Sequence, residues 1–259
     1  MILVLKLILT PFFIGAVTLA GRRWGPVVSG LLTGLPLTSG PVSFILALQY
    51  GTPFAARAAV GALVGQVSVC LFCLAYTLAS RRTAWPLSAT FAIGMFLAAT
   101  AVWNGLKWTL WPAAGVLVSV ITLLAWRLPA PAVAAAPAAP PRWDLPARMV
   151  IAATFVVLLT TAANSLGPQL SGLISPLPIF GVVLAAFTHH QQGAPAAARL
   201  LRGIVVGSLA FGGFFLVVGL CVTALPLPAT YLLACAAALA ASGFSFYLTR
   251  RDQRLTPSR

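Results

Sequence analysis

Long apolar segments separated by short basic turns run through almost the whole of this 259-residue sequence. Sixty per cent of the residues are hydrophobic, 7% are charged, and the mean hydropathy is +1.01. A soluble domain of this size cannot bury so much apolar surface, whereas a bilayer accepts it directly. The sequence therefore predicts an all-α polytopic membrane protein with about nine transmembrane helices. The predicted spans are 2–20, 26–48, 54–79, 84–105, 108–127, 147–165, 168–189, 198–222 and 227–249.

The basic residues cluster between the apolar segments, which is typical of membrane topology and not of a nucleic-acid-binding face. With the N-terminus outside and the C-terminus in the cytoplasm, 13 of the 16 Lys and Arg residues lie on the cytoplasmic side. The three exceptions are Lys6, Arg57 and Lys107. We therefore expect a multi-pass protein of a bacterial inner (cytoplasmic) membrane that contacts the lipid bilayer and binds no nucleic acid.

Two Gly/Pro-rich stretches, GPVVSGLLTGLPLTSGP at 25–41 and GPQLSGLISPLPIFG at 167–181, align when the chain is shifted by 142 residues. The alignment continues into the next turn, where Gln49, Gly51, Pro53 and Arg57 meet Gln191, Gly193, Pro195 and Arg199. Such a register of Gly, Pro and Arg predicts an internal repeat. Each repeat holds four spans, and the single span between them gives the repeats opposite orientations. The predicted organisation is a four-helix repeat at 1–106, a linking helix and Pro/Ala-rich linker at 107–145, an inverted four-helix repeat at 146–249 and a basic tail at 250–259.

Both Gly/Pro-rich stretches lie inside predicted spans, where they predict broken helices. Proline removes a backbone hydrogen bond, and the freed groups survive in a membrane only when they are buried in protein or line a wet cavity. Matching breaks in inverted repeats favour a substrate path near the membrane midplane. Close helix packing, or kinking without a ligand, is the alternative explanation. The predicted path consists of Thr33, Gly34, Pro36, Thr38, Ser39, Gly40, Ser171, Gly172, Ser175, Pro176, Pro178 and Gly181.

Acidic residues are almost absent, since Asp144 and Asp252 are the only two and both fall in polar cytoplasmic segments. Coupling to protons or cations through a membrane carboxylate is therefore not expected. Neither a catalytic constellation nor a set of metal ligands is assembled, so we expect no enzymatic activity, no metal and no cofactor. Arg57 and Arg199 either fix the topology or gate and attract anions. Gln66 either lines a pore or bonds to another helix.

The segment SGLLTGLPLTSGPVSFILALQYG at 29–51 resembles the second span of small four-span bacterial membrane proteins of the GlpM-like type. The shared pattern is a Gly-Leu stretch, a Leu-Pro break and an apolar run that ends in a polar turn. The resemblance implies a tandem pair of such units, with an added span that inverts the second, and it assigns no functional residue. Fused fluoride channels have the same plan of four, one and four spans, although their pore motifs are not present here.

These features favour a membrane transport protein that moves a small neutral or anionic solute between the two broken helices. Two alternatives remain open at this point: an anion channel built from dual-topology repeats, and a non-transporting scaffold or accessory subunit. A homo-oligomer or another membrane partner is compatible with each of them.

Overall fold

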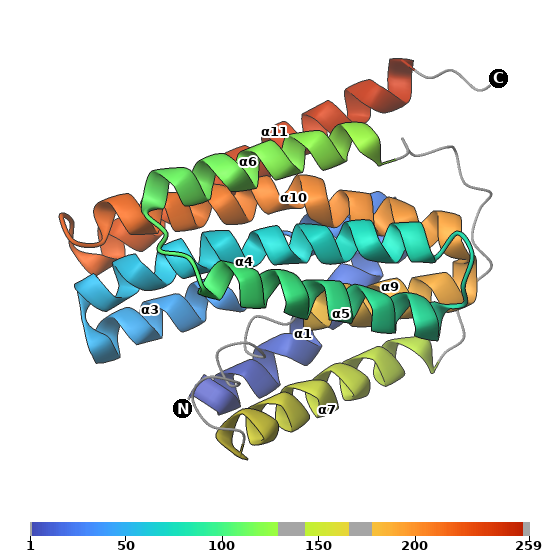
Figure 1. The fold of residues 1–259 in the computed structure, drawn as a ribbon, viewed down its shortest axis with the longest axis horizontal. Coiled ribbons are helices and arrows are strands. Elements are labelled where there is room, and N and C mark those ends of the chain that lie inside the picture. Colours follow the sequence, from blue (N-terminus) through green and yellow to red (C-terminus); the bar gives the residue numbers. More distant parts are fainter. Residues whose placement is uncertain (1, 129–142, 166–177, 256–259) are drawn as a thin grey trace.

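The computed structural model of this chain describes residues 2–128, 143–165 and 178–255, and its regular structure is entirely helical (Figure 1). Ten helices lie within these residues. In chain order they are α1 (Ile2–Trp24), α2 (Pro26–Thr33), α3 (Ser39–Tyr50), α4 (Thr52–Ala79), α5 (Trp85–Asn104), α6 (Leu110–Arg127), α7 (Asp144–Ser165), α9 (Ile179–Gln192), α10 (Ala194–Cys221) and α11 (Leu227–Leu255). The prediction of an all-α chain is confirmed.

Five of these helices are long and apolar enough to cross a membrane: α4, α5, α6, α10 and the Leu227–Tyr247 part of α11. They correspond to the third, fourth, fifth, eighth and ninth predicted spans. The outer faces of the peripheral helices carry large apolar side chains, such as Trp126 on α6 and Leu232 on α11, which are 78% and 71% exposed. Exposed apolar surface on helices of this length suits lipid contact. The chain is a multi-pass membrane protein.

The second predicted span is broken, as the sequence indicated. Helix α2 ends at Thr33 and α3 begins at Ser39, so the backbone leaves the helical path between them. Pro36 has no N–H to donate, and its carbonyl accepts a bond of 2.9 Å from the N–H of Gly40, in the first turn of α3. The counterpart stretch in the second half, 166–177, lies outside the described residues, and α9 begins directly after Pro178.

Helix boundaries recur at the same spacing as the sequence repeat. Helices α4 and α10 are each 28 residues long, and their first residues differ by 142 in number. Gly51 precedes α4 and Gly193 precedes α10, both with a φ of +83°, a backbone conformation that residues with a Cβ rarely adopt. In Figure 1, α4 and α10 run in opposite directions, as do α1 and α7.

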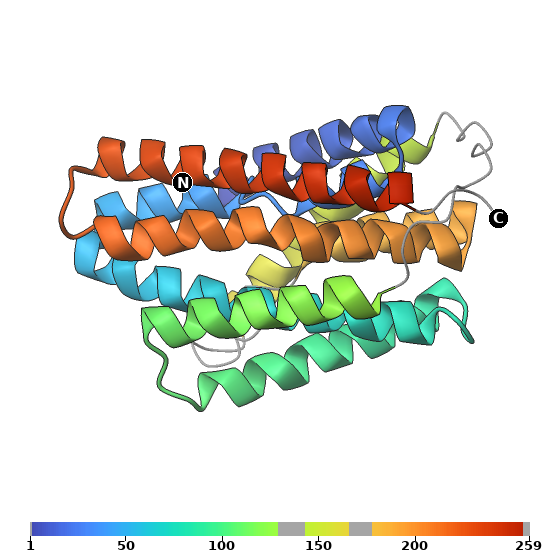
Figure 2. The ribbon, with the colours of Figure 1, turned by 90° about the horizontal axis from the view of Figure 1, so that it is seen from above.

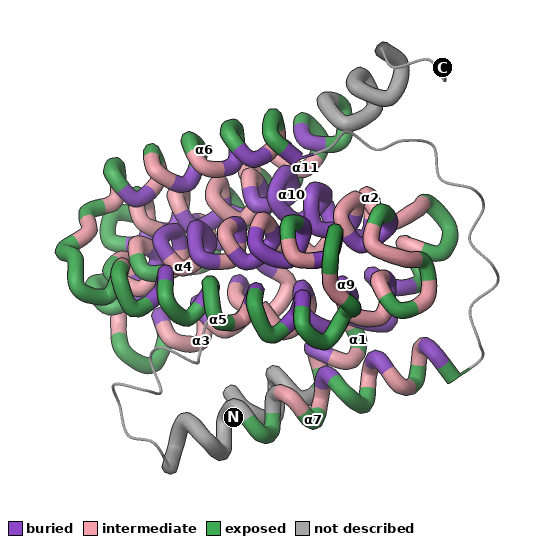
Figure 3. Tube along the Cα trace, turned by 45° about the vertical axis from the view of Figure 1, so that its right-hand side comes forward, coloured by how far each residue is buried: buried purple, intermediate pink, exposed green. Residues whose placement is uncertain are grey.

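The two long helices α4 and α10 form the centre of the molecule. Helix α10 packs against α2, α4, α6 and α11, and α4 also packs against α5 (Figure 2). Their contact faces are buried, whereas the outer faces of α5, α6 and α7 are largely exposed (Figure 3). Helices α1, α7 and α9 meet in a smaller cluster around Ile14, Ala152 and Val183. In a bilayer such packing depends on close van der Waals contact rather than on the hydrophobic effect.

Candidate functional site

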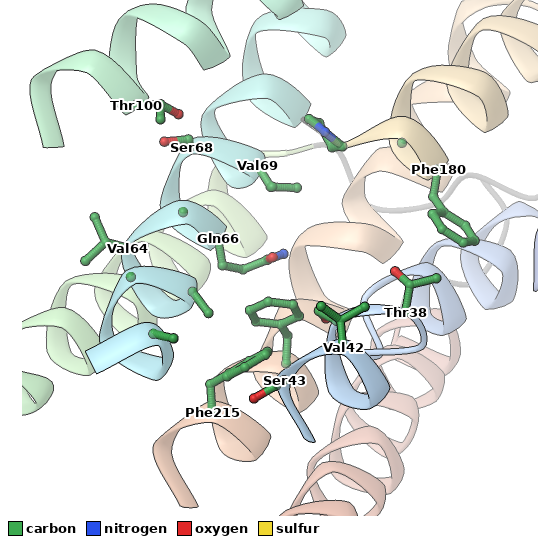
Figure 4. A pocket seen from close by; sticks show the side chains of 18 of the residues that line it. Thr38, Val42, Ser43, Val64, Gln66, Ser68, Val69, Thr100, Phe180 and Phe215 are labelled. Atoms are coloured by element: carbon green, nitrogen blue, oxygen red, sulfur yellow. The ribbon is translucent and has the colours of Figure 1, made fainter. Parts of the chain in front are cut away.

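A cavity of about 710 Å³ lies beside the break between α2 and α3 (Figure 4). Its described walls come from the break itself, α3, the middle of α4, the end of α5 with the α5–α6 turn, the start of α9, and α10, with one residue from α1. Six of the residues predicted for the path or its gate line it: Thr33, Thr38, Ser39, Gln66, Pro178 and Gly181. The fold therefore brings the first break and the start of α9 to one cavity, although these segments are far apart in the sequence.

Three other predicted path residues lie outside the cavity lining and serve the packing of the break. A Cβ built on Gly34 would lie 2.3 Å from the carbonyl carbon of Gly207, and one built on Gly40 would lie 3.3 Å from the ring of Phe214. Pro36 is buried between these two contacts along the chain. These three residues therefore contribute to packing, and the polar side chains of the break that line the cavity are its hydroxyl residues.

The remaining predicted residues are placed as follows. Ser171, Gly172, Ser175 and Pro176 lie outside the described residues. Arg57 is exposed in the second turn of α4, and Arg199 is half-buried on α10. Neither arginine belongs to the described lining of the cavity.

Four glycines lie where α2 and α10 approach most closely. Gly30 of α2 and Gly34, directly after its end, face Gly203 and Gly207 of α10, and a Cβ built on any of the four would lie within 2.6 Å of backbone atoms across the contact. Small residues spaced by four let helix backbones approach closely in membranes. This contact holds the broken helix of the first half against the central helix of the second half.

Gln66 lines the cavity and also bonds to another helix, whereas its role in a pore stays a prediction. It lines the cavity from α4, and its Nε2 donates a hydrogen bond of 2.8 Å to the Oγ of Ser208 on α10. The Ser208 hydroxyl in turn donates to the carbonyl of Ile204 at 2.8 Å. Two successive hydrogen bonds therefore connect the Gln66 side chain, at the cavity wall, to Ser208 and the backbone of α10.

The sequence did not single out Ser68, Thr100 and Trp103, which also line the cavity. Their side-chain polar atoms are buried and have no hydrogen-bond partner among the described residues. In the sequence, these residues appear only as hydroxyl or indole side chains within apolar spans. Many other residues of this chain fit that description, so it does not identify them as cavity residues. Only the tertiary placement distinguishes them.

The described lining of the cavity contains no charged side chain. It combines hydroxyl and amide groups with aromatic rings, including those of Trp108, Phe180 and Phe215. Such a surface binds solutes through hydrogen bonds and apolar contact, without a formal counter-charge. Within the described residues no group of three or more His, Cys, Asp or Glu side chains could hold a metal ion.

Beyond Gly181 the protein is packed. The Phe72 ring lies 3.5 Å from the point where a Cβ of Gly181 would be, and both Phe72 and Tyr76 are fully buried. The hydroxyl of Tyr76 lies 3.4 Å from Nδ1 of His189. The cavity therefore extends from the break toward the α5–α6 turn, and not toward the end of the molecule where α4 meets α5.

An ion-pair cluster holds α1, α7 and α9 together at that packed end. Asp144 accepts hydrogen bonds from Arg22 Nη2 at 2.8 Å, from Arg148 Nε at 2.9 Å and from the side-chain amide of Gln191. Burial alone raises the pKa of the Asp144 carboxyl, but these hydrogen bonds and the charge of Arg148 outweigh it and bring the pKa below its usual value. The sequence had assigned Arg22 and Arg148 to topology only.

Comparisons with protein-family models, with curated proteins and with solved structures find no match to this chain.

Proposed function

We propose that this protein transports a small uncharged or anionic solute across a bacterial inner membrane, along the cavity beside the α2–α3 break. The observation that carries this proposal is the shape of the interior. A cavity of about 710 Å³ reaches from the broken helix to the α5–α6 turn, while the opposite end is closed by packed aromatic rings and an ion-pair cluster. A cavity closed at one end is what one state of an alternating-access carrier requires.

An alternating-access carrier also needs a second state, in which the cavity opens to the other side of the membrane. In this proposal that state arises from an inverted pair of four-helix repeats, with α6 between them. Three observations support the pair: the equal lengths of α4 and α10, their opposite directions in Figure 1, and the bond between Gln66 and Ser208, whose numbers differ by 142. When inverted repeats exchange their conformations, a site that faces one side of the membrane comes to face the other.

In this mechanism the solute enters from the α5–α6 end and binds beside Thr38, Ser39 and Gln66. Opening the packed end requires separation of Tyr76 from His189 and rearrangement of the Asp144 cluster. With the N-terminus outside, the α5–α6 turn faces the exterior and the Asp144 cluster faces the cytoplasm. The described helices place no carboxylate in the cavity, so the solute's own gradient is the simplest driving force.

The glycine contact between α2 and α10 favours a second candidate, a membrane scaffold or accessory subunit. In that case the break serves only to seat α2 on α10, and the cavity is closed to water and solute. The two candidates differ in the hydration of Thr38, which lines the cavity at the break.

Cysteine accessibility in right-side-out membrane vesicles distinguishes the candidates. The background carries Cys221→Ala and Cys235→Ala, and it retains the buried Cys70 and Cys73. Thr38→Cys is the test variant, and Ser119→Cys, on the exposed face of the linking helix α6, is the matched control facing lipid. Both are treated with a charged methanethiosulfonate reagent that does not cross membranes.

A transport path predicts labelling at position 38 well above that at position 119, since the reagent attacks hydrated thiolates. Labelling of Thr38→Cys no faster than of Ser119→Cys would contradict a water-filled path and favour the scaffold. Lys107→Cys, at an exposed position of the α5–α6 turn outside the cavity lining, serves as the positive control for the reagent.

A further inference from the structure

Two hydroxyls and one indole N–H on the α4–α5 side of the cavity have no hydrogen-bond partner among the described residues. They are the Oγ of Ser68, the Oγ1 of Thr100 and the Nε1 of Trp103. Ser68 is fully buried and Thr100 is 5% exposed, and all three residues line the cavity. A buried polar group without a partner destabilises the fold, so its presence calls for an explanation.

Six other hydroxyls on the described helices take a local partner. They donate to the carbonyl four residues earlier, at 2.8–3.0 Å, and belong to Thr33, Thr77, Thr90, Ser119, Thr122 and Ser208. The same bond requires only a suitable side-chain rotamer, and it is the usual solution for Ser and Thr inside membrane helices. Ser68 and Thr100 do not adopt it. Their hydroxyls are therefore directed at something other than their own helix.

The three groups lie close together in the fold. Thr100 and Trp103 are three residues apart on α5 and so share one face of that helix. Ser68 is on α4, which packs against α5, and in Figure 4 the oxygens of Ser68 and Thr100 point toward one another. The two hydroxyls thus meet where α4 packs against α5, at the wall of the cavity, and Trp103 lies one turn further along α5.

We propose that Ser68, Thr100 and Trp103 form the hydrogen-bonding subsite of this cavity, and that it binds an uncharged organic solute through the acceptor oxygens of its hydroxyl or carbonyl groups. This inference rests on the transport function proposed above and narrows its solute class. The indole N–H can only donate, and both hydroxyls have a hydrogen available. One oxygen accepts at most two of these bonds, so a solute that satisfies all three donors carries more than one acceptor oxygen.

The charge of the solute follows from the rest of the lining. A formal anion in an apolar site needs an opposite charge or a dense set of donors, and without them its burial costs several kcal/mol. The described lining offers no charged side chain, and it includes the aromatic rings of Phe180, Phe211 and Phe215. An oxygen-bearing but uncharged molecule suits both the donors and the apolar walls.

The test compares neutral and anionic solutes that share a carbon skeleton. Purified protein is reconstituted into liposomes, and solute entry is followed by osmotic swelling with erythritol against erythronate and xylitol against xylonate. The anions are supplied as potassium salts with valinomycin. Variants remove one polar atom each while conserving shape, namely Ser68→Ala, Thr100→Val and Trp103→Phe. Thr122→Val, which removes an exposed hydroxyl of α6, is the matched control.

We expect the wild-type protein to accelerate entry of a neutral member over empty liposomes, and its anionic partner to enter more slowly. Loss of one hydrogen bond to the solute predicts a decrease of roughly threefold to tenfold in the rate at limiting concentration. Thr122→Val leaves the rate unchanged. Thr100→Ser, which keeps the hydroxyl, retains the wild-type rate and excludes a folding defect as the cause.

Faster entry of the anionic members would overturn the uncharged class. A neutral flux that Ser68→Ala, Thr100→Val and Trp103→Phe leave intact would overturn the subsite while the transport function stands. If no solute enters faster than into empty liposomes, the labelling of Thr38→Cys decides: a labelled cysteine overturns only the solute class, and an unlabelled one overturns the transport function as well.

Discussion

Gln66 and Ser208 occupy equivalent positions of the sequence repeat, 142 residues apart, and they are hydrogen-bonded to each other at 2.8 Å. Two equivalent residues can touch only close to the axis that relates their repeats. The crossing point of α4 and α10 therefore lies on, or next to, the pseudo-twofold axis of the proposed inverted pair. This is also the place where the cavity reaches the centre of the protein.

The roles of these two side chains in their bond are unequal, and this gives the first prediction. Ser208→Ala leaves the Gln66 amide without its acceptor, whereas Gln66→Leu leaves Ser208 still bonded to the carbonyl of Ile204. We expect Ser208→Ala to destabilise the protein by about 1–3 kcal/mol and Gln66→Leu by less than about 1 kcal/mol. Thermal unfolding in detergent measures both. Equal losses, or a larger loss in Gln66→Leu, would contradict this assignment of roles.

The glycine contact between α2 and α10 predicts a strong effect of a single methyl group. In Gly207→Ala the new Cβ would lie 2.6 Å from the carbonyl oxygen of Leu31, a backbone atom that no rotamer change can move. Overpacking of this kind costs about 1–3 kcal/mol and lowers the unfolding midpoint. Gly115→Ala on α6 is the control, because nothing lies within 4 Å of its new Cβ. There the midpoint is unchanged or rises through the better helix propensity of alanine.

The turns before α4 and α10 predict a matched pair of effects. Gly51 and Gly193 share a φ of +83° with ψ values of 168° and 170°, a region that is almost exclusive to glycine. Gly51→Ala and Gly193→Ala should each destabilise by about 1–3 kcal/mol, since the space around both is otherwise open enough for a Cβ. Denaturation of the two variants side by side checks the prediction. A loss in one variant only would show that the turns are not equivalent.

The Asp144 cluster predicts a dependence of stability on pH. Because the pKa of Asp144 lies below its usual 3.8 in the folded protein, the carboxylate contributes stability above that value and loses it as the pH falls through the folded-state pKa. Asp144→Asn removes the part of the free energy of unfolding that depends on ionisation of this carboxyl group. It also leaves the buried Arg148 without its anion, which costs about 3–5 kcal/mol.

Unfolding midpoints of the wild type and of Asp144→Asn, measured from neutral pH to about pH 3, test the cluster. The difference between the two proteins should be largest at neutral pH and should decrease with acidification. A difference that does not change with pH would contradict the role of the ionised carboxylate. Arg23→Gln is the control for a nearby exposed arginine with no part in the cluster.

The sequence was sufficient to predict features that depend on local chemistry. Membrane class follows from apolar segments of spanning length, and the break follows from Gly34 and Pro36, because proline cannot donate to the helix. The glycine before each long helix was visible as a match between Gly51 and Gly193. In each case the cause lies within a few residues of the effect, so no knowledge of the fold is needed.

Features that depend on which helices touch could not be predicted. The bond between Arg22 and Asp144 joins residues 122 apart. Gly34 was predicted to belong to the substrate path, because its contact with Gly207 becomes visible only when α2 and α10 are packed together. Ser68 and Thr100 were passed over for the same reason, since a hydroxyl in an apolar span is ordinary until the neighbouring helix fails to supply it with a partner.

The glycine contact between α2 and α10 joins the two proposed repeats, which lie on one continuous chain. Two separate four-helix proteins would associate in the bilayer at a rate set by their abundance, and a small contact of this kind would dissociate when the copies are few. On a single chain the two halves are held at a high effective concentration, so assembly is independent of expression level. One continuous chain also fixes a ratio of one to one, and each half is then free to acquire substitutions that a symmetric homodimer would have to carry twice.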